Sequence, residues 1–171
     1  HPDVPDRHGC DDEVRTFLEY PIVHEPGTVF MYDSMGTNML AAVVKRVTGY
    51  NLFQFLRFRV LEPMGIYGVD CDSCTSGKDQ GGGGSRLKTE DMAKITILYL
   101  NKGKWNGKQI LSEKWIEEST KAADVEYYGY LFWRGEYNSF RADGKYSQIS
   151  MILPQKNAVV SFVSECRRGE E

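Results

Sequence analysis

The spacing of apolar residues changes once along this chain, from a helical to a strand period, and this limits the fold more than any other feature. Before residue 121 apolar residues recur every three or four positions, which predicts amphipathic helices. After Val125 they alternate with other residues, which predicts strands at about 128–133, 139–142, 148–153 and 158–164. Helices followed by strands predict an α+β fold, with the last two strands forming an antiparallel hairpin.

The helical part contains several residues that are typical of helix ends. Asp33 and Ser34 are good N-caps for a helix that Gly49 ends, with Met39, Leu40, Val43, Val44 and Val47 on one stripe. A short helix is also expected at about 12–20. Later helices are predicted to begin after Asn51, Thr89 and Ser112, with Gly65 and Gly103 ending the first two of these.

The chain has 171 residues, which is enough for one domain. No internal repeat or linker divides it, so residues 1–171 are predicted to form a single partial domain, mainly helical over 10–125 and stranded over 126–165. The 21 basic and 24 acidic residues give a net charge of −3, which lacks the positive footprint of a nucleic-acid binder. No apolar run reaches the ~18 residues of a membrane span.

The cysteines and histidines point to no cofactor and no metal. Cys71 and Cys74 form a C-x-x-C, but Cys10 and Cys166 stand alone, so the second ligand pair of a zinc site is missing. The pair is interpreted as free loop thiols. All three histidines lie in the first 24 residues, which leaves little for a Ser-His-Asp triad.

Two further motifs are interpreted as structural. Residues 81–84 are four consecutive glycines without the Gly-Lys-Ser/Thr of a phosphate loop, and they predict a flexible loop whose backbone passes close to something. Ser85 and Lys88 form a literal S-x-x-K. A nucleophile in that motif needs the serine at the start of a helix, whereas Ser85 precedes the predicted helix. A hydrolase that uses Ser85 remains a minor alternative.

Tyr32 lies at a predicted junction between a loop and a helix, two residues before Ser34. Such a tyrosine can be a core aromatic with its hydroxyl at the surface. It can equally be a catalytic phenol, whose pKa near 10 would have to fall beside a cation or a helix N-terminus.

Three ordered blocks of the chain resemble the serine β-lactamase-like hydrolases, which include class C β-lactamases, penicillin-binding DD-peptidases and esterases; the last block is the predicted strands from Tyr128 to Ser164, which look like the family's closing sheet. Residues 25–66 contain PGTVFMYDS, a helix ending in TG and a second ending in EPMGI. Residues 81–120 contain a glycine-rich run, TEDMA and WNGKQILS. The resemblance covers about residues 20–165 and implies a β-lactamase/transpeptidase-like fold.

The resemblance also implies functional residues. Tyr32 matches the family's general base or proton relay, and Ser34 stands where the family often has Asn. Ala142, Asp143 and Gly144 fall on the family's Lys/His-x-Gly motif beside the site, and the Lys145 amide would donate to the oxyanion. The helix that carries the family's Ser-x-x-Lys would precede Pro26, and the 25 residues there contain no such motif.

The expected function is therefore part of a serine hydrolase that forms an acyl-enzyme from an ester, amide or peptide-like substrate. This segment is expected to be inactive alone, because both ends look cut and the nucleophile is missing. A non-catalytic binding module with the same fold is the alternative. Self-association is expected through surface that the missing segments leave uncovered. The absence of a signal peptide leaves the compartment open, in the cytoplasm or outside it.

Overall fold

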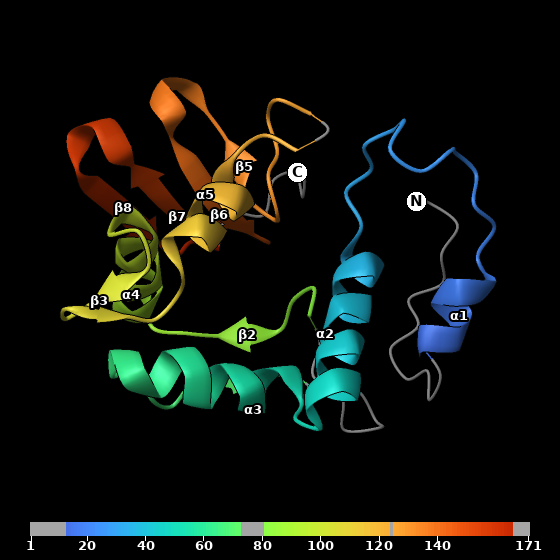
Figure 1. Cartoon of the computed structure of the whole chain (residues 1–171), viewed down its shortest axis with the longest axis horizontal. Coiled ribbons are helices and arrows are strands. Elements are labelled where there is room, and N and C mark those ends of the chain that lie inside the picture. The colour runs from blue at the N-terminus through green and yellow to red at the C-terminus, as the bar shows by residue number, and fades with distance from the viewer. Residues whose placement is uncertain (1–12, 73–80, 124, 166–171) are drawn as a thin grey trace. The chain divides into compact units, whose positions relative to one another are not determined.

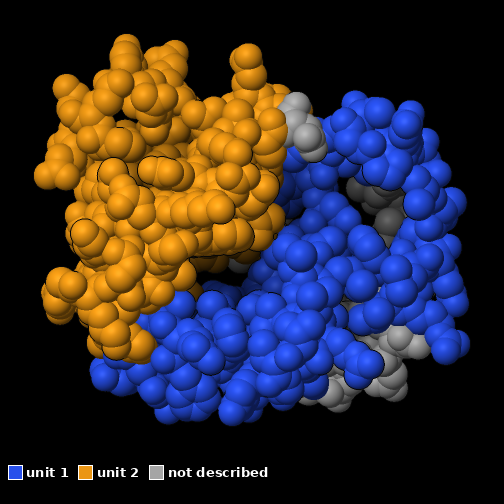
Figure 2. All heavy atoms as spheres, in the orientation of Figure 1, with its two compact units in different colours: residues 1–62, 67–86 blue, residues 63–66, 87–171 orange. Residues whose placement is uncertain are grey.

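The computed structural model describes residues 13–72, 81–123 and 125–165. The chain divides into two compact units, His1–Glu62 with Tyr67–Arg86, and Pro63–Ile66 with Leu87–Glu171 (Figure 2). The single domain expected over residues 1–171 stays a prediction. Among the described residues, no helix combines the length and the apolar character that crossing a membrane requires.

The first unit is mainly helical (Figure 1). Its elements are α1 (Glu13–Glu19), α2 (Ser34–Thr48), α3 (Leu52–Leu56), the π-helical turn η1 (Arg57–Leu61), and the short strands β1 (Asp70–Cys71) and β2 (Ser85–Arg86). Asp33 is the N-cap of α2, because its carboxylate accepts hydrogen bonds from the backbone N–H of Met35 at 2.8 Å and of Gly36 at 3.1 Å. Gly49 ends α2 with a φ of 76°.

The apolar stripe of α2 is only partly covered. Leu40, Val43 and Val47 are 56%, 52% and 73% exposed, whereas Ala41 is 6% exposed on another face of the helix. The periodicity predicts the helix correctly. It does not say which part of the apolar surface packs within this chain, because periodicity describes the helix and not its neighbours.

The second unit holds the sheet (Figure 1). The strands β5 (Trp133–Arg134), β6 (Phe140–Gly144), β7 (Gln148–Leu153) and β8 (Ala158–Phe162) pair antiparallel in sequence order. Helix α4 (Thr89–Leu100) packs against β7 and β8, where Leu98 and Ile152 have no exposed surface. The remaining elements are η2 (Glu62–Met64), which joins the units, the hairpin β3 (Lys104–Trp105) and β4 (Lys108–Gln109), α5 (Glu113–Thr120), η3 (Glu136–Asn138) and η4 (Pro154–Lys156).

The α+β class, with helices before an antiparallel sheet, is therefore confirmed, as is the β7–β8 hairpin. Ser112 caps α5 by accepting from the Trp115 N–H at 3.1 Å. Helix α4 begins at Thr89 with Lys88 at the N-cap position, one residue earlier than predicted.

The strand predicted at 128–133 is wrong over most of its length. Only Trp133 and the following residue pair with β6, and Tyr128 makes a single bridge to Trp133. The chain folds back because the Gly129 N–H donates to the Phe132 carbonyl at 2.9 Å, and the Tyr130 N–H donates to a carbonyl of α5, that of Ser119, at 2.9 Å. The alternating aromatic residues over 128–133 therefore lie mostly in a turn and not in a ladder of hydrogen bonds between strands.

Candidate active site

Tyr32 and Ser34 lie at the start of α2, in the first unit. A turn precedes them, in which the Thr28 N–H donates to the Glu25 carbonyl at 3.1 Å and Gly27 has a φ of 83°. The chain is then extended up to Asp33, and Ser34 is the first helical residue. Tyr32 is 59% exposed, which fits a phenol that meets a substrate better than a core aromatic.

Asp143, Gly144 and Lys145 lie in the second unit, where β6 turns into β7. The Arg141 Nε donates to both carboxylate oxygens of Asp143, at 2.9 and 3.1 Å, so Asp143 is already held by a cation from its own strand. Gly144 pairs with Gln148, and a Cβ built on Gly144 would lie 2.9 Å from the Gln148 Cβ. The strand pair therefore comes closer at this glycine than a larger residue allows.

The turn after Gly144 places exposed groups next to the strand end. The Lys145 ammonium lies 5.0 Å from the centre of the Tyr146 ring, a cation–π distance. Tyr146 and Ser147 have φ values of 63° and 66°, which L-residues rarely adopt.

Residues 142–144 lie on a free side of the sheet. Among the described strands, β5 pairs with β6 only at Phe140 and Arg141, whereas β7 pairs with all five residues of β6. Ala142, Asp143 and Gly144 therefore have a strand neighbour on one side only within the described part of the chain. A strand edge of this kind can bind the backbone of an extended ligand.

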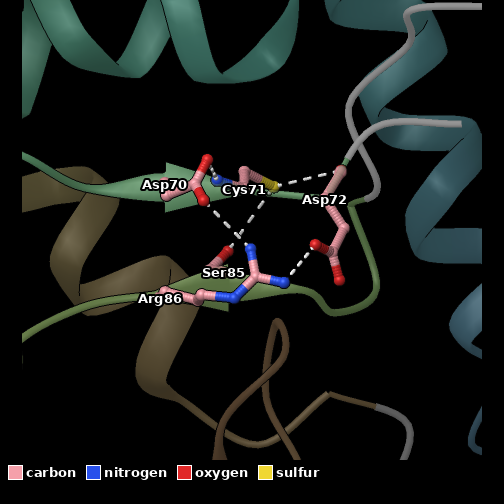
Figure 3. Close-up of polar contacts among 5 residues, drawn as sticks. All are labelled: Asp70, Cys71, Asp72, Ser85 and Arg86. Atoms are coloured by element: carbon pink, nitrogen blue, oxygen red, sulfur yellow. Dashed lines mark hydrogen bonds and ion pairs between the residues drawn. The ribbon is translucent and has the colours of Figure 1, made fainter.

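The S-x-x-K motif is not arranged as a nucleophile on a helix. Ser85 lies in β2, where its Oγ is 3.9 Å from the Cys71 Sγ (Figure 3). Lys88 precedes α4. The motif lacks the helical turn that would bring an amine to the hydroxyl, so the geometry favours the interpretation as a chance match.

The described residues contain no group of three or more His, Cys, Asp or Glu side chains that could hold a metal ion. Cys71 lies in β1 and His24 is exposed. The remaining predicted thiols and imidazoles lie outside the described residues; these are His1, His8, Cys10, Cys74 and Cys166.

The model of the Beta-lactamase family matches residues 2–171. The chain belongs to this family. The fold expected from the sequence is that of the family, and the relatives of the chain include one protein named as an esterase and one named as a hydrolase.

Individual relatives of this beta-lactamase-family chain cover it to different extents. A Penicillium rubens lovastatin esterase is 40% identical over 53 residues, which is 31% of this chain and 13% of that protein. A Bacillus anthracis structure named "Putative 6-aminohexanoate-dimer hydrolase" is 25% identical with a TM-score of 0.82, covering 90% of this chain and 43% of its own. A Bacteroides dorei structure named "putative beta-lactamase" is 15% identical with a TM-score of 0.81, covering 99% and 60%.

The chain thus spans between 43% and 60% of the length of those two solved structures.

The sequence did not point to one residue in the first turns of α2, Asn38. The Asn38 side-chain oxygen accepts a hydrogen bond from the Gly82 N–H at 2.9 Å. The glycine run was expected to pass close to something, but the sequence does not name its neighbour.

Proposed function

We propose that this chain is part of a serine hydrolase that cleaves an ester or amide through an acyl-enzyme. Family membership over residues 2–171 carries the proposal. The exposed position of Tyr32 at the N-terminus of α2 supports the role of this residue. The printed names of two relatives, an esterase and a dimer hydrolase, support esters and amides as the substrate class.

In the proposed reaction, a serine hydroxyl attacks the carbonyl carbon of the substrate. Tyr32 takes the hydroxyl proton as the C–O bond forms, and it returns this proton to the leaving alcohol or amine as the old bond breaks. The Lys145 N–H donates to the oxyanion, and Gly144 lets the substrate approach the strand. Water then attacks the carbonyl carbon of the acyl-enzyme; Tyr32 takes a proton from the water and returns it to the serine oxygen as the bond between the acyl group and the serine breaks and the acid leaves.

The serine of this reaction is not assigned to any residue of the 171. Ser85, the one serine followed at the correct spacing by a lysine, lies in a strand and not on a helix. We therefore propose that the chain alone does not become acylated, and that the nucleophile belongs to a Ser-x-x-Lys helix encoded upstream of Pro26 in the parent protein.

The test compares the 171-residue chain with a longer form that includes the upstream coding sequence. Both are incubated with a fluorescent penicillin and with p-nitrophenyl butyrate, and intact masses are measured. The longer form should release p-nitrophenol or gain an adduct on its upstream serine, and the short chain should do neither. An adduct on Ser85 would contradict the proposal. Ligand binding without turnover by the longer form would support the alternative of a non-catalytic binding module.

The role of Tyr32 has a matched control. In the longer form, Tyr32→Phe should lower kcat by roughly 10²- to 10⁴-fold, the usual contribution of a general base. Tyr67, 67% exposed in the same unit, is a second surface phenol. Tyr67→Phe should leave the rate unchanged, and equal losses in both variants would remove Tyr32 from the mechanism.

We further propose that the short chain self-associates through α2. Leu40, Val43 and Val47 expose more than half of their surface, and such patches favour burial against another molecule. Sedimentation velocity over a range of concentrations should detect the association, and Val43→Lys should weaken it. A monomer at all concentrations would contradict this.

A further inference from the structure

The glycine-rich run lies directly on the first turns of α2. A Cβ built on Gly81 would lie 2.4 Å from the Thr37 carbonyl oxygen and 3.2 Å from the Ala41 Cβ. A Cβ on Gly82 would lie 2.7 Å from the Ser34 carbonyl oxygen and 3.1 Å from the Ser34 Cβ. We call Gly81 and Gly82 the glycine strap. No other residue type fits there without movement of the helix or of the strap.

The strap follows one face of the helix. Ser34, Thr37 and Ala41 are spaced three and four residues apart, so they lie in one row along α2. Asn38 borders the same row, and its Oδ1 accepts the 2.9 Å hydrogen bond from the Gly82 N–H. The contact joins residues that are 44 positions apart, so it is a tertiary contact rather than a local turn.

A second anchor holds the chain just beyond the strap (Figure 3). The Asp72 N–H donates to the Gly84 carbonyl at 3.0 Å, next to the β1–β2 pair. The Arg86 guanidinium donates to Asp70 at 3.1 Å and to Asp72 at 2.5 Å. The hydrogen bond to Asp72, followed by its charge, raises the pKa of Arg86 above its usual value. The chain after residue 80 is thus fixed at both Gly82 and Arg86.

We propose that the glycine strap and Asn38 form a positioning device for the start of α2, which fixes the direction of Tyr32 and Ser34 at the site. This deepens the proposed function and rests on it for the roles of Tyr32 and Ser34. Asp33 accepts hydrogen bonds from N–H groups at the N-terminal end of α2, but it does not cover the side of the first helical turn. The strap contacts that side at Ser34, two residues from the Tyr32 phenol.

Catalysis requires this degree of fixation, because a proton relay acts over hydrogen-bond distance and loses rate when it is displaced by about 1 Å. Ser34 contacts Gly82 through its own backbone and Cβ. A side chain at position 82 therefore displaces the residue that begins the helix. Asn38 is a positioning residue in this scheme, since it acts through the strap.

The test uses the full 171-residue chain and two pairs of variants. Gly82→Ala places a Cβ against Ser34, whereas Gly83→Ala places one where no atom lies within 4 Å. Asn38→Ala removes the acceptor for the Gly82 N–H, and Asn38→Asp keeps one. Hydrogen exchange of peptides over residues 30–38, and the ¹³C signal of the Tyr32 ring carbon that bears the hydroxyl, assigned by its loss in Tyr32→Phe, are measured in each.

Gly82→Ala and Asn38→Ala should speed exchange over residues 34–38 by about tenfold, the effect of losing one hydrogen bond, and should shift the Tyr32 signal. Gly83→Ala and Asn38→Asp should match the wild type in both measurements. Exchange in α4 should be unchanged in every variant, which shows that the chain is folded. Equal effects of Gly82→Ala and Gly83→Ala, or an unmoved Tyr32 signal in Asn38→Ala, would overturn the proposal.

The readouts need no catalysis, so they separate this proposal from the proposed function. In the longer form, Asn38→Ala should lower kcat with little change in KM, because the strap orients a proton relay and not the bound substrate. A longer form without activity but with the expected Tyr32 shift would reject the hydrolase and keep the strap. An active longer form in which the Tyr32 signal does not shift would keep the hydrolase and reject the positioning role of the strap.

Discussion

The Asp91 carboxylate and the Lys94 ammonium lie 2.6 Å apart in the first turns of α4, and Asp91 is only 4% exposed. The Lys94 Nζ also approaches the Gly65 carbonyl at 3.4 Å. The pair therefore ties the start of α4 to residues 63–66 of the same unit. A carboxylate near a helix N-terminus gains further from the dipole.

Replacing Asp91 should destabilise the second unit more than replacing its neighbour does. Asp91→Ala removes the charge-assisted hydrogen bond and the dipole interaction, at a cost of about 2 kcal/mol in the free energy of unfolding. Glu90 lies in the same turn but is exposed, so Glu90→Ala should cost less than about 1 kcal/mol. Urea denaturation measures both, and equal losses would mean that the buried pair adds nothing.

The contact of α4 with the sheet should be the most sensitive part of the core. Leu98 and Ile152 are fully buried, so Leu98→Ala should lower the free energy of unfolding by about 3 kcal/mol through lost burial and a cavity. Val160 in β8 is 45% exposed, and Val160→Ala should cost less than about 1 kcal/mol. Thermal and urea unfolding measure both variants. A smaller difference between the losses of Leu98→Ala and Val160→Ala would mean that α4 and the sheet are loosely packed.

Tyr99 should make the protein sensitive to alkali. Burial raises the pKa of the Tyr99 phenol, although hydrogen bonds with the Trp115 and Ser119 side chains oppose the shift. The unfolded chain therefore loses this proton first, near pH 10. The stability contributed is complete below about pH 10 and is lost as the pH rises towards the folded pKa.

The measurement is the free energy of unfolding between pH 8 and 11. Tyr99→Phe should flatten the decline above about pH 10, by at most ~1.4 kcal/mol per pH unit for one proton. Tyr67→Phe removes an exposed phenol of the first unit and should leave the decline as in the wild type. If the free energy of unfolding of Tyr99→Phe declines as steeply with pH as that of the wild type, burial of Tyr99 is not the cause of the decline.

Backbone strain in the β6–β7 turn predicts a stabilising substitution. Ser147 has a φ of 66°, a conformation that glycine adopts without the usual Cβ cost of about 1 kcal/mol. Ser147→Gly should therefore raise the melting temperature by a few degrees. The exposed Gly107 has a φ of 79° with open space around it, so Gly107→Ala should lower it. A fall in both variants would show that unfolded-state entropy outweighs the strain at Ser147.

Local chemistry alone was enough to predict several elements. Asp33 and Ser112 cap helices because their oxygens reach the N–H groups two or three residues ahead. The alternation over 148–153 predicts β7 with its correct bounds, and the turn after it predicts the pairing with β8. Tyr32 was a candidate from its place before a predicted helix as well as from the resemblance, whereas Ser34, Asp143, Gly144 and Lys145 came from the resemblance, and the roles of all five stay predictions.

Other features were outside the reach of local patterns. The alternation at 128–133 gives mostly a turn because Tyr130 bonds to Ser119 of α5. The loop expected around the C-x-x-C and the glycine run contains the β1–β2 pair. Its strands are joined by backbone pairing, by Arg86 with Asp70 and Asp72, and by the contact of Ser85 with Cys71.

The sequence by itself determined that helices precede an antiparallel sheet, and it determined the caps of α2 and α5, the last hairpin and the family, since each rests on neighbours within a few residues or on motifs read in order along the chain. Only the tertiary structure decided that Gly82 lies on Ser34, that Asn38 holds it, and that Leu40 and Val43 stay exposed. The physical reason is distance along the chain. Packing and close backbone approach depend on residues tens of positions apart, which no local period records.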